Sequence, residues 1–303
     1  MIRQSGMGMA AEPPVSSTGL INSSIRHRQE LVLHSEQEGA LALSVYLGAT
    51  AAELDVRVAA VEVVYYPAAF PESAEAVQCV DTGVAWCAQI TDLLPERDYR
   101  FRAYAYDTCD DRIGSRVVYY GEHPPVTVRA GENQPISILT APGSGAVVFY
   151  DRLADGTVAG LHPNGWRHLE AAPSDACTEG SVLHRWAAWG SDIASAEATE
   201  LGAGAANTAA IAVVHSLAPE EADTAAAAAT YALNGYRDWF LPSKDELSAM
   251  YARRDLIGGF MPGYYWSSSQ HDAETAWVQL FVDGYQCTNT KRAFSRVRAI
   301  RAV

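Results

Sequence analysis

The sequence predicts a multidomain chain, with an all-β sandwich over residues 26–130 and an α+β domain over residues 146–303. The length of 303 residues exceeds that of one average domain. The first half consists of short alternating runs of β-branched and aromatic residues, whereas the second half mixes helical patterns with strands. Residues 1–25, rich in Pro and Ser, are expected to form a flexible leader. Residues 131–145, dense in Gly, Pro, Asn and Ser, are expected to be a linker between two independent cores.

Strand patterns dominate the first domain. Its apolar runs alternate between two faces, are separated by Pro, Gly and Asp turns, and are not interrupted by any helical period longer than two turns. About seven short strands in roughly 100 residues is the pattern of a β-sandwich. The clearest runs are LALSVYL (41–47), VRVAAVEVVYY (56–66), YRFRAYAY (99–106) and PVTVRA (125–130).

A short motif refines this prediction. The segment LLPERDYRFRAYAYD places Leu94 and Pro95 ahead of Tyr99. It resembles the tyrosine corner of fibronectin type III and related immunoglobulin-like modules, in which the tyrosine hydroxyl bonds back to the preceding corner. The resemblance implies an immunoglobulin-like sandwich. Another type of β-sandwich stays open, because Trp86, the only tryptophan of this half, does not stand where such modules carry their core tryptophan.

Helix and strand signals alternate in the second domain. Ser243 and Glu246 have the spacing of a capping box at the start of a helix, and the chain after about residue 264 returns to strand patterns. The domain is therefore α+β, with its first and last strands free to pair. The other expected elements are a hairpin turning at Ala154, Asp155 and Gly156, a helix over 207–217 with Asn207 as its N-cap, and a helix over 220–233 closed by Asn234 and Gly235.

Composition and charge exclude several classes of protein. With 49% hydrophobic and 19% charged residues, the chain can bury a core and does not have the composition of a disordered protein. The formal charge of 22 − 36 = −14 repels phosphate backbones, so nucleic-acid binding is not expected. The chain has no run of about 18 apolar residues, so no membrane span is expected. The N-terminus also lacks the apolar core of a secretory signal.

The cysteines do not indicate a metal site. They form no CxxC pair and no zinc spacing, and their odd number argues against a complete disulfide framework. Cys79 and Cys87 are candidates for a disulfide across a hairpin, and the redox compartment stays open. The five cysteines are Cys79, Cys87, Cys109, Cys177 and Cys287.

Candidate catalytic groups do not assemble into a recognisable active site. The three serines at 267–269 lack the G-x-S-x-G frame, and they stand too near His271 in an extended segment to form a hydrogen-bonded pair. The run GAGAAN (202–207) lacks the third glycine of a dinucleotide loop. The acidic run YDTCDD (106–111) fits a solvated turn better than a Ca²⁺ loop. We therefore expect no enzyme, no cofactor and no bound metal.

Four motifs in a fixed order carry a resemblance for the second domain. They are NGYRDWFLPSKDELSAMY, GYYWSSSQ, AWVQLFVDGYQ and RVRAIRAV. Together they resemble the DUF1566 family, the C-terminal domain type of a collagen-like adhesin and a branch of the C-type lectin fold related to formylglycine-generating enzymes. The enzymatic relatives use a cysteine pair near the C-terminus, where this chain has Cys287 alone. The calcium-dependent lectins use E-P-N or Q-P-D and W-N-D motifs, which are also missing.

The same motifs resemble the variable target proteins of diversity-generating retroelements, whose changing positions lie between fixed W-S-S-S, A-W, G-x-Q and R-V-R anchors. This resemblance implies a frame in which Trp239, Trp266 and Trp277 fill the core. Aromatic and charged side chains displayed on such a frame suit ligand binding, with Tyr285 and Phe294 as anchors. The candidate ligand-binding positions are His271, Asp272, Thr275, Val278, Leu280, Val282, Asp283, Tyr285, Thr288, Thr290, Arg292, Ala293 and Phe294.

The function expected from these resemblances is binding of a protein or glycan ligand on another cell or surface. The protein would be displayed on a bacterial surface, secreted, or carried on a phage particle, and its oligomeric state stays open. The alternative is an adhesin of fixed specificity for sulfated or acidic glycans, since residues 291–301 hold five cations and no acid. Against it, Arg296, Arg298 and Arg301 are expected to neutralise carboxylates at the core edge. A formylglycine-generating type of enzyme is the remaining, third class.

Overall fold

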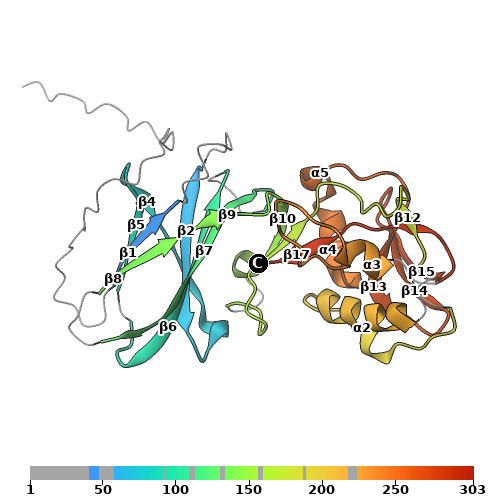
Figure 1. Ribbon diagram of the computed structural model, residues 1–303, viewed down its shortest axis with the longest axis horizontal. Helices are drawn as coiled ribbons and strands as arrows, with labels where there is room; N and C mark the ends of the chain where they lie inside the picture. The colour runs from blue at the N-terminus through green and yellow to red at the C-terminus, as the bar shows by residue number, and fades with distance from the viewer. Residues whose placement is uncertain are drawn as a thin grey trace, which may run out of the picture.

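The computed structural model describes residues 41–47, 58–91, 93–108, 113–129, 134–155, 160–186, 189–217 and 224–303. Two lobes lie side by side, and the C-terminus lies between them (Figure 1). The expected leader at 1–25 and residues 109–111 of the acidic run lie outside the described residues. None of the helices in the described parts of the chain is long and apolar enough to cross a membrane.

The N-terminal lobe is a sandwich of two sheets, as the alternating strand patterns predict. Its core lies between the sheets and includes Leu43, Val63, Phe101 and Ile138. The smaller sheet contains, in spatial order, β4 (Val80–Asp81), β5 (Trp86–Ile90), β1 (Leu41–Tyr46) and β8 (Gln134–Leu139). The larger sheet contains β3 (Glu75–Gln78), β2 (Ala60–Pro67), β6 (Arg97–Tyr106), β7 (Val117–Val128) and β9 (Ala141–Pro142), with the 3₁₀ turn η2 (Pro71–Ser73) after β2.

The predicted corner is present at the start of β6. The Leu94 N–H donates to the hydroxyl oxygen of Tyr99 over 3.2 Å, and the Tyr99 side chain is buried. The bond joins the connection that leaves the smaller sheet to the first inward residue of β6 in the larger sheet. It therefore fixes the crossover between the two sheets, which is the role that the motif predicts.

The prediction of a linker over 131–145 is wrong for most of that segment. Residues Gln134–Leu139 form β8, which pairs in parallel with β1, and Ala141–Pro142 pair with β7. Ile136 and Ile138 are buried between the sheets. The Gly and Asn residues that suggested a linker flank an alternating QPISIL run, and Pro135 lies within it. The N-terminal sandwich therefore extends to about residue 142.

The C-terminal lobe combines two further sheets with five helices among its described residues. The first and last strands of the lobe belong to one sheet, with β11 between them. That sheet contains β10 (Val147–Asp151), β11 (His168–Ala171) and β17 (Ile300–Ala302). The second contains β12 (Leu183–His184), β16 (Ser295–Arg296), β13 (Tyr264–Gln270), β14 (Thr275–Leu280) and β15 (Gln286–Thr290). The helices are α1 (Arg152–Asp155), α2 (Gly204–Leu217), α3 (Thr224–Ala229), α4 (Lys244–Ala252) and α5 (Arg254–Ile257), with the 3₁₀ turn η3 (Ala194–Ala196).

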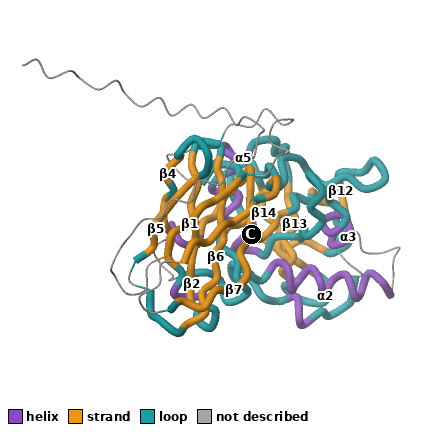
Figure 2. Tube along the Cα trace, turned by 60° about the vertical axis from the view of Figure 1, so that its left-hand side comes forward, coloured by secondary structure: helices purple, strands orange, loops and turns teal. Residues whose placement is uncertain are grey.

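In both views α2 runs along the lower edge of the C-terminal lobe, with α3 above it (Figure 1 and Figure 2). Two predictions for them are wrong. Helix α2 begins at Gly204, so Asn207 is not its N-cap. The buried side-chain amide of Asn207 donates instead to the Ala198 carbonyl and the Ser268 hydroxyl. Helix α3 ends at Ala229, and Asn234 lies in a turn beyond it. Tertiary contacts thus override the local capping signals here.

The expected hairpin at Ala154–Gly156 is also absent from this position. After β10 the chain enters α1, and the strand that pairs with β10 is β11, which begins at His168. Because α1 and the turns after it separate the two strands, β10 and β11 are joined by a long connection rather than a two-residue turn.

The predicted capping box at α4 is confirmed. The Ser243 side chain accepts from the Glu246 N–H, and the Glu246 carboxylate accepts from the Ser243 N–H over 2.7 Å. A second N–H, that of Gly202, donates to Glu246 over 2.8 Å. Burial raises the pKa of Glu246 to about 7, although these N–H donors act in the opposite direction.

This carboxyl should make stability depend on pH. The folded pKa lies above the ordinary value of 4.5, so the stabilising contribution is complete below pH 4.5 and is lost as the pH rises through about 7. The difference corresponds to roughly 3 kcal/mol. We expect wild-type stability to fall between pH 5 and 8, and Glu246→Gln to lose stability overall but to flatten this slope. Urea denaturation across this range measures both, with the exposed Glu274→Gln as control. An unchanged slope in Glu246→Gln would refute the assignment.

The two lobes share a buried interface. Val64, Tyr104 and Tyr106 of the sandwich pack in one cluster with Val148 and Val303 of the C-terminal lobe. Backbone bonds cross it as well: the Gly114 N–H donates to the Val148 carbonyl over 2.8 Å. Each lobe also has an apolar cluster of its own, but the two cores are not independent as expected, because one further cluster is built from both lobes.

An ion-pair network lies inside this interface. The Arg167 guanidinium, 3% exposed, donates to Glu62 on β2 over 2.7 Å and to both carboxylate oxygens of Asp151 on β10 over 3.0 Å. His168 lies 3.5 Å from Asp151, and its Nε2 is 3.2 Å from the Tyr106 hydroxyl. Burial raises the pKa of Asp151, but the hydrogen bonds and charges of His168 and Arg167 outweigh it and hold the pKa well below its usual range.

Candidate functional site

The serines at 267–269 lie within β13 and are fully buried. The Ser267 hydroxyl donates to the Trp277 carbonyl over 3.0 Å, and the Ser269 hydroxyl donates to the Ala198 carbonyl over 2.7 Å. The imidazole of His271 instead contacts Asp272 and Thr275. The serine hydroxyls therefore hold β13 against its neighbours and point away from solvent.

Most of the predicted display positions are on the surface. Val278 is an exception, because it is 1% exposed and packs in the core with Ala276 and Trp266. Thr275, Leu280 and Ala293 are half-buried. The exposed positions are His271, Asp272, Val282, Asp283, Tyr285, Thr288, Thr290, Arg292 and Phe294.

The assignment of Trp277 as a core residue is only partly right. It is half-buried on the face of β14 opposite Val278, with the Lys244 ammonium 4.2 Å from its ring centroid and the His271 ring edge-on at 5.4 Å. Trp239 and Trp266 are buried, as predicted.

Five of the exposed positions fall into two separate groups. Tyr285 immediately precedes β15, whereas Arg292 lies two residues beyond its end. The five residues of β15 span roughly 17 Å in extended form. We call the group at the β14–β15 turn, Val282, Asp283 and Tyr285, the turn-end patch. The group after β15, Arg292 and Phe294 with the residues they contact, is the loop-end patch.

Gly284 fixes the backbone of the turn-end patch. Its φ is +83°, and a Cβ there would overlap the ring of Tyr251, which packs edge-on against Phe281. Left-handed backbone costs other residues roughly 1–2 kcal/mol, and the overlap adds to that. We expect Gly284→Ala to lower the free energy of unfolding by about 2–4 kcal/mol. Tyr285→Ala, at a side chain 61% exposed, should cost under about 1 kcal/mol. Urea denaturation compares them, and a wild-type midpoint for Gly284→Ala would contradict this geometry.

The loop-end patch pairs two arginines with two exposed aromatic rings. The Arg292 guanidinium lies 4.1 Å from the ring centroid of Trp189, and that of Arg185 lies 4.9 Å from Phe294. The two segments are adjacent, because the Trp186 N–H donates to the Lys291 carbonyl over 3.1 Å. Sequence reasoning missed Arg185 and Trp189, since they stand about a hundred residues before the other members and carry no motif.

Four of the five cations in 291–301 have partners inside the lobe. Arg298 and Arg296 bind Asp175, and Arg301 binds Asp238 and Glu170, which confirms the expected neutralisation of carboxylates. Lys291 is buried and donates to the Ser191 carbonyl and Gln270, and burial lowers its pKa to about 8. Arg292 is exposed, and no carboxylate among the described residues pairs with it.

Cys79, Cys87, Cys177 and Cys287 are free thiols, so the Cys79–Cys87 disulfide is not formed in this structure. Within the described ranges, no three His, Cys, Asp or Glu side chains gather in a way that would hold a metal ion.

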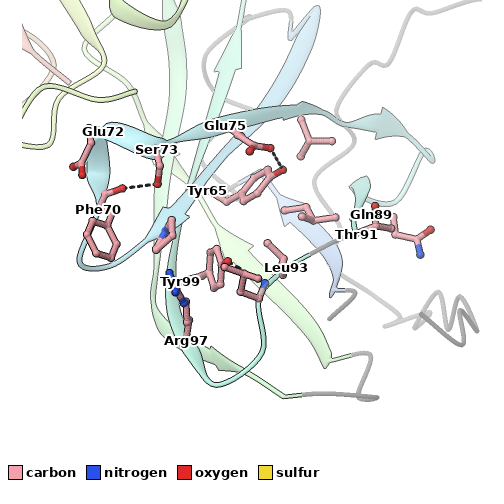
Figure 3. Close-up of a pocket in the computed structure, with 14 residues that line it drawn as sticks. Tyr65, Phe70, Glu72, Ser73, Glu75, Gln89, Thr91, Leu93, Arg97 and Tyr99 are labelled. Atoms are coloured by element: carbon pink, nitrogen blue, oxygen red, sulfur yellow. Dashed lines mark hydrogen bonds between the residues drawn. The ribbon is translucent and has the colours of Figure 1, made fainter. Parts of the chain in front are cut away.

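A cavity of about 620 Å³ lies in the N-terminal sandwich, where the ends of its two sheets meet the η2 turn (Figure 3). Its floor includes the buried Leu93 and Tyr99, and Phe70 stands at its mouth with 49% exposure. Glu72 and Arg97 line its rim. The cavity could not be predicted from the sequence, because its walls come from segments that are separate in the chain.

No protein-family model matches the chain, and no curated protein is similar to it in sequence. A fimbrial protein from Bacteroides ovatus has a TM-score of 0.36 at 8% identity, over 87% of this chain and 70% of that one. A candidate polysaccharide-binding protein (DUF1812) from Bacteroides thetaiotaomicron has a TM-score of 0.23 at 15% identity, over 33% of this chain and 46% of that one. Both scores are too low to assign a fold or a function to this chain. The resemblance to DUF1566 stays a prediction.

Proposed function

We propose that the chain is a non-enzymatic ligand-binding protein of the receptor or adhesin type. In this proposal its C-terminal lobe has a C-type lectin fold and displays a diversified surface, as a target protein of a diversity-generating retroelement. The ligand is a protein or glycan on another cell or surface, and the protein acts at a bacterial surface, after secretion or on a phage particle.

The supporting observation is the division of residues 264–303 into buried and exposed positions. The expected anchors Trp266, Ser268 and Arg298 are fully buried. The intervals between the anchors hold the nine exposed positions named above, together with the buried Val278. A surface of this kind tolerates changes of side chain at little cost in stability. Aromatic and arginine residues on a rigid frame are the groups that most often dominate binding energy in interfaces.

The diversification is tested by sequencing the last coding segment from independent isolates. We expect substitutions to concentrate at the nine exposed positions and to spare the buried anchors. A reverse transcriptase gene and a near-repeat of this segment are expected beside the gene. Substitutions spread evenly over exposed and buried positions, with no such neighbours, would contradict the proposal.

The alternative is an adhesin of fixed specificity for acidic or sulfated glycans. It is favoured by the loop-end patch, where Arg292 and Arg185 are held on aromatic rings without carboxylate partners among the described residues. Immobilised chondroitin sulfate separates the two functions. Under the alternative, Arg292→Ser weakens capture, high salt does the same, and Tyr285→Ser has no effect. Under the first proposal, neither the two substitutions nor high salt changes capture of this probe, because the polymer is not the selected ligand.

A further inference from the structure

The cavity of the N-terminal sandwich is separate from both display patches, which lie on the other lobe. Its volume of about 620 Å³ lies within the range of roughly 300–1,000 Å³ that is usual for small-molecule sites. It opens between the η2 turn, the end of β5 and the corner before β6 (Figure 3). These segments are pinned by local bonds, including the one from the Leu94 N–H to Tyr99 and one from the Tyr65 hydroxyl to Glu75 over 2.7 Å. These two bonds hold the corner before β6 and the pairing of β2 with β3, which form two walls of the cavity.

Apolar and aromatic side chains form part of the cavity lining, beside polar ones such as Thr91 and Gln89. Ile90 and Leu93 are 2% and 5% exposed, and Tyr99 closes the floor beside them. The Phe70 ring at the mouth keeps about half its surface in water. A ligand with one apolar face would cover this ring and the floor together.

The rim carries three planar polar groups that are available to form hydrogen bonds with a ligand. Within the described part of the chain, the side chains of Glu72, Gln89 and Arg97 make no hydrogen bond or ion pair. A carboxylate offers acceptors, a guanidinium offers donors, and an amide offers both. Adjacent hydroxyl groups, each both donor and acceptor, match such a set.

The charges of the rim favour a neutral ligand. Glu72 and Glu75 oppose an anion, and Arg97 opposes a cation, so an ion of either sign meets a like charge. A ligand with an apolar face and many hydroxyl groups avoids both penalties. We propose that this cavity binds a neutral saccharide, with one ring face on Phe70 and its hydroxyl groups on Glu72, Gln89 and Arg97. The sandwich then binds a ligand of its own in addition to supporting the display lobe.

Calorimetric titration of the full chain tests this, with neutral gluco-, manno-, galacto- and xylo-oligosaccharides as probes. We expect at least one series to bind with a Kd of about 0.01–1 mM. Phe70→Ala and Arg97→Ala should each weaken that binding about tenfold, which is the effect of one lost stacking contact or charged hydrogen bond. Matched controls on the same lobe are Leu139→Ala, at an exposed apolar residue, and Arg100→Ala, at an exposed arginine, both away from the cavity lining. All four variants should melt within a few degrees of wild type.

Three results would overturn the assignment. They are no binding of any neutral oligosaccharide by the folded chain, equal binding by wild type and both cavity variants, and binding confined to charged saccharides. Arg292→Ser, on the other lobe, should leave saccharide binding at the cavity unchanged. Failure of the display function and failure of the cavity assignment can thus be distinguished.

Discussion

Arg167→Met is expected to lower the free energy of unfolding by about 3–5 kcal/mol, because the change removes one partner of a buried ion pair. Methionine fills much of the same volume, so the loss comes mainly from charge. Glu62 keeps a bond from Gln78 over 2.8 Å, but Asp151 keeps only the His168 contact and the Leu153 N–H. Asp151 then remains inside the interface without its guanidinium partner.

The pH dependence of this loss separates charge from packing. Without Arg167, the folded pKa of Asp151 should be higher than in wild type, so ionisation of this carboxyl stabilises the variant less. The difference between variant and wild type should therefore be smaller at pH 4 than at pH 7. Urea denaturation at both values measures it, with Arg237→Met, at an exposed arginine of the same lobe, as control. A loss that is equal at both pH values would assign the effect to packing and contradict the network.

Trp239→Ala is expected to cost about 3–5 kcal/mol, the usual effect of emptying an aromatic core position. Trp239 is 3% exposed, packs edge-on against Tyr231 at 5.1 Å, and donates from its indole N–H to the Tyr236 carbonyl over 3.2 Å. The substitution would leave an empty volume in the core and remove the donor to the Tyr236 carbonyl. The surrounding core is closely packed, so neighbouring side chains cannot easily compensate for either loss.

The loss of stability in Trp239→Ala is compared with the losses caused by the same change at two aromatic residues of the display patches. Tyr285 and Phe294 are 61% and 56% exposed, so Tyr285→Ala and Phe294→Ala should each cost under about 1 kcal/mol. Thermal and urea unfolding of the three variants measure the contrast. Similar losses in all three would mean that the display residues support the core and are not free to change.

The sequence predicted elements whose signals are local. The strands of the sandwich follow from alternation, and the start of α4 follows from the capping box at Ser243. Strand β8 was missed because its burial depends on pairing with β1, some ninety residues earlier. The interface network could not be predicted for the same reason, since Arg167 meets Glu62 across 105 positions of sequence.

The candidate site shows the same limit at the scale of one residue. Trp277 was predicted to lie in the core and Val278 on the surface. In the structure Val278 faces inward, and Trp277 is half-buried on the opposite face of the strand. Alternation along a strand has a period of two, so an error of one residue exchanges the faces. Exposure at turns such as 282–285 was easier to predict, because the turn residues have no sheet to face.

The shared interface also bears on the entropy of binding. Lobes joined by a mobile hinge would lose freedom of relative orientation when a target is held by both, and this loss would subtract from affinity. Here an apolar cluster and a buried guanidinium already join the lobes in the free protein. A target that touches the sandwich and the display lobe together would therefore meet two surfaces at a preset angle. Recognition would then select the spacing of groups on the target as well as their chemistry.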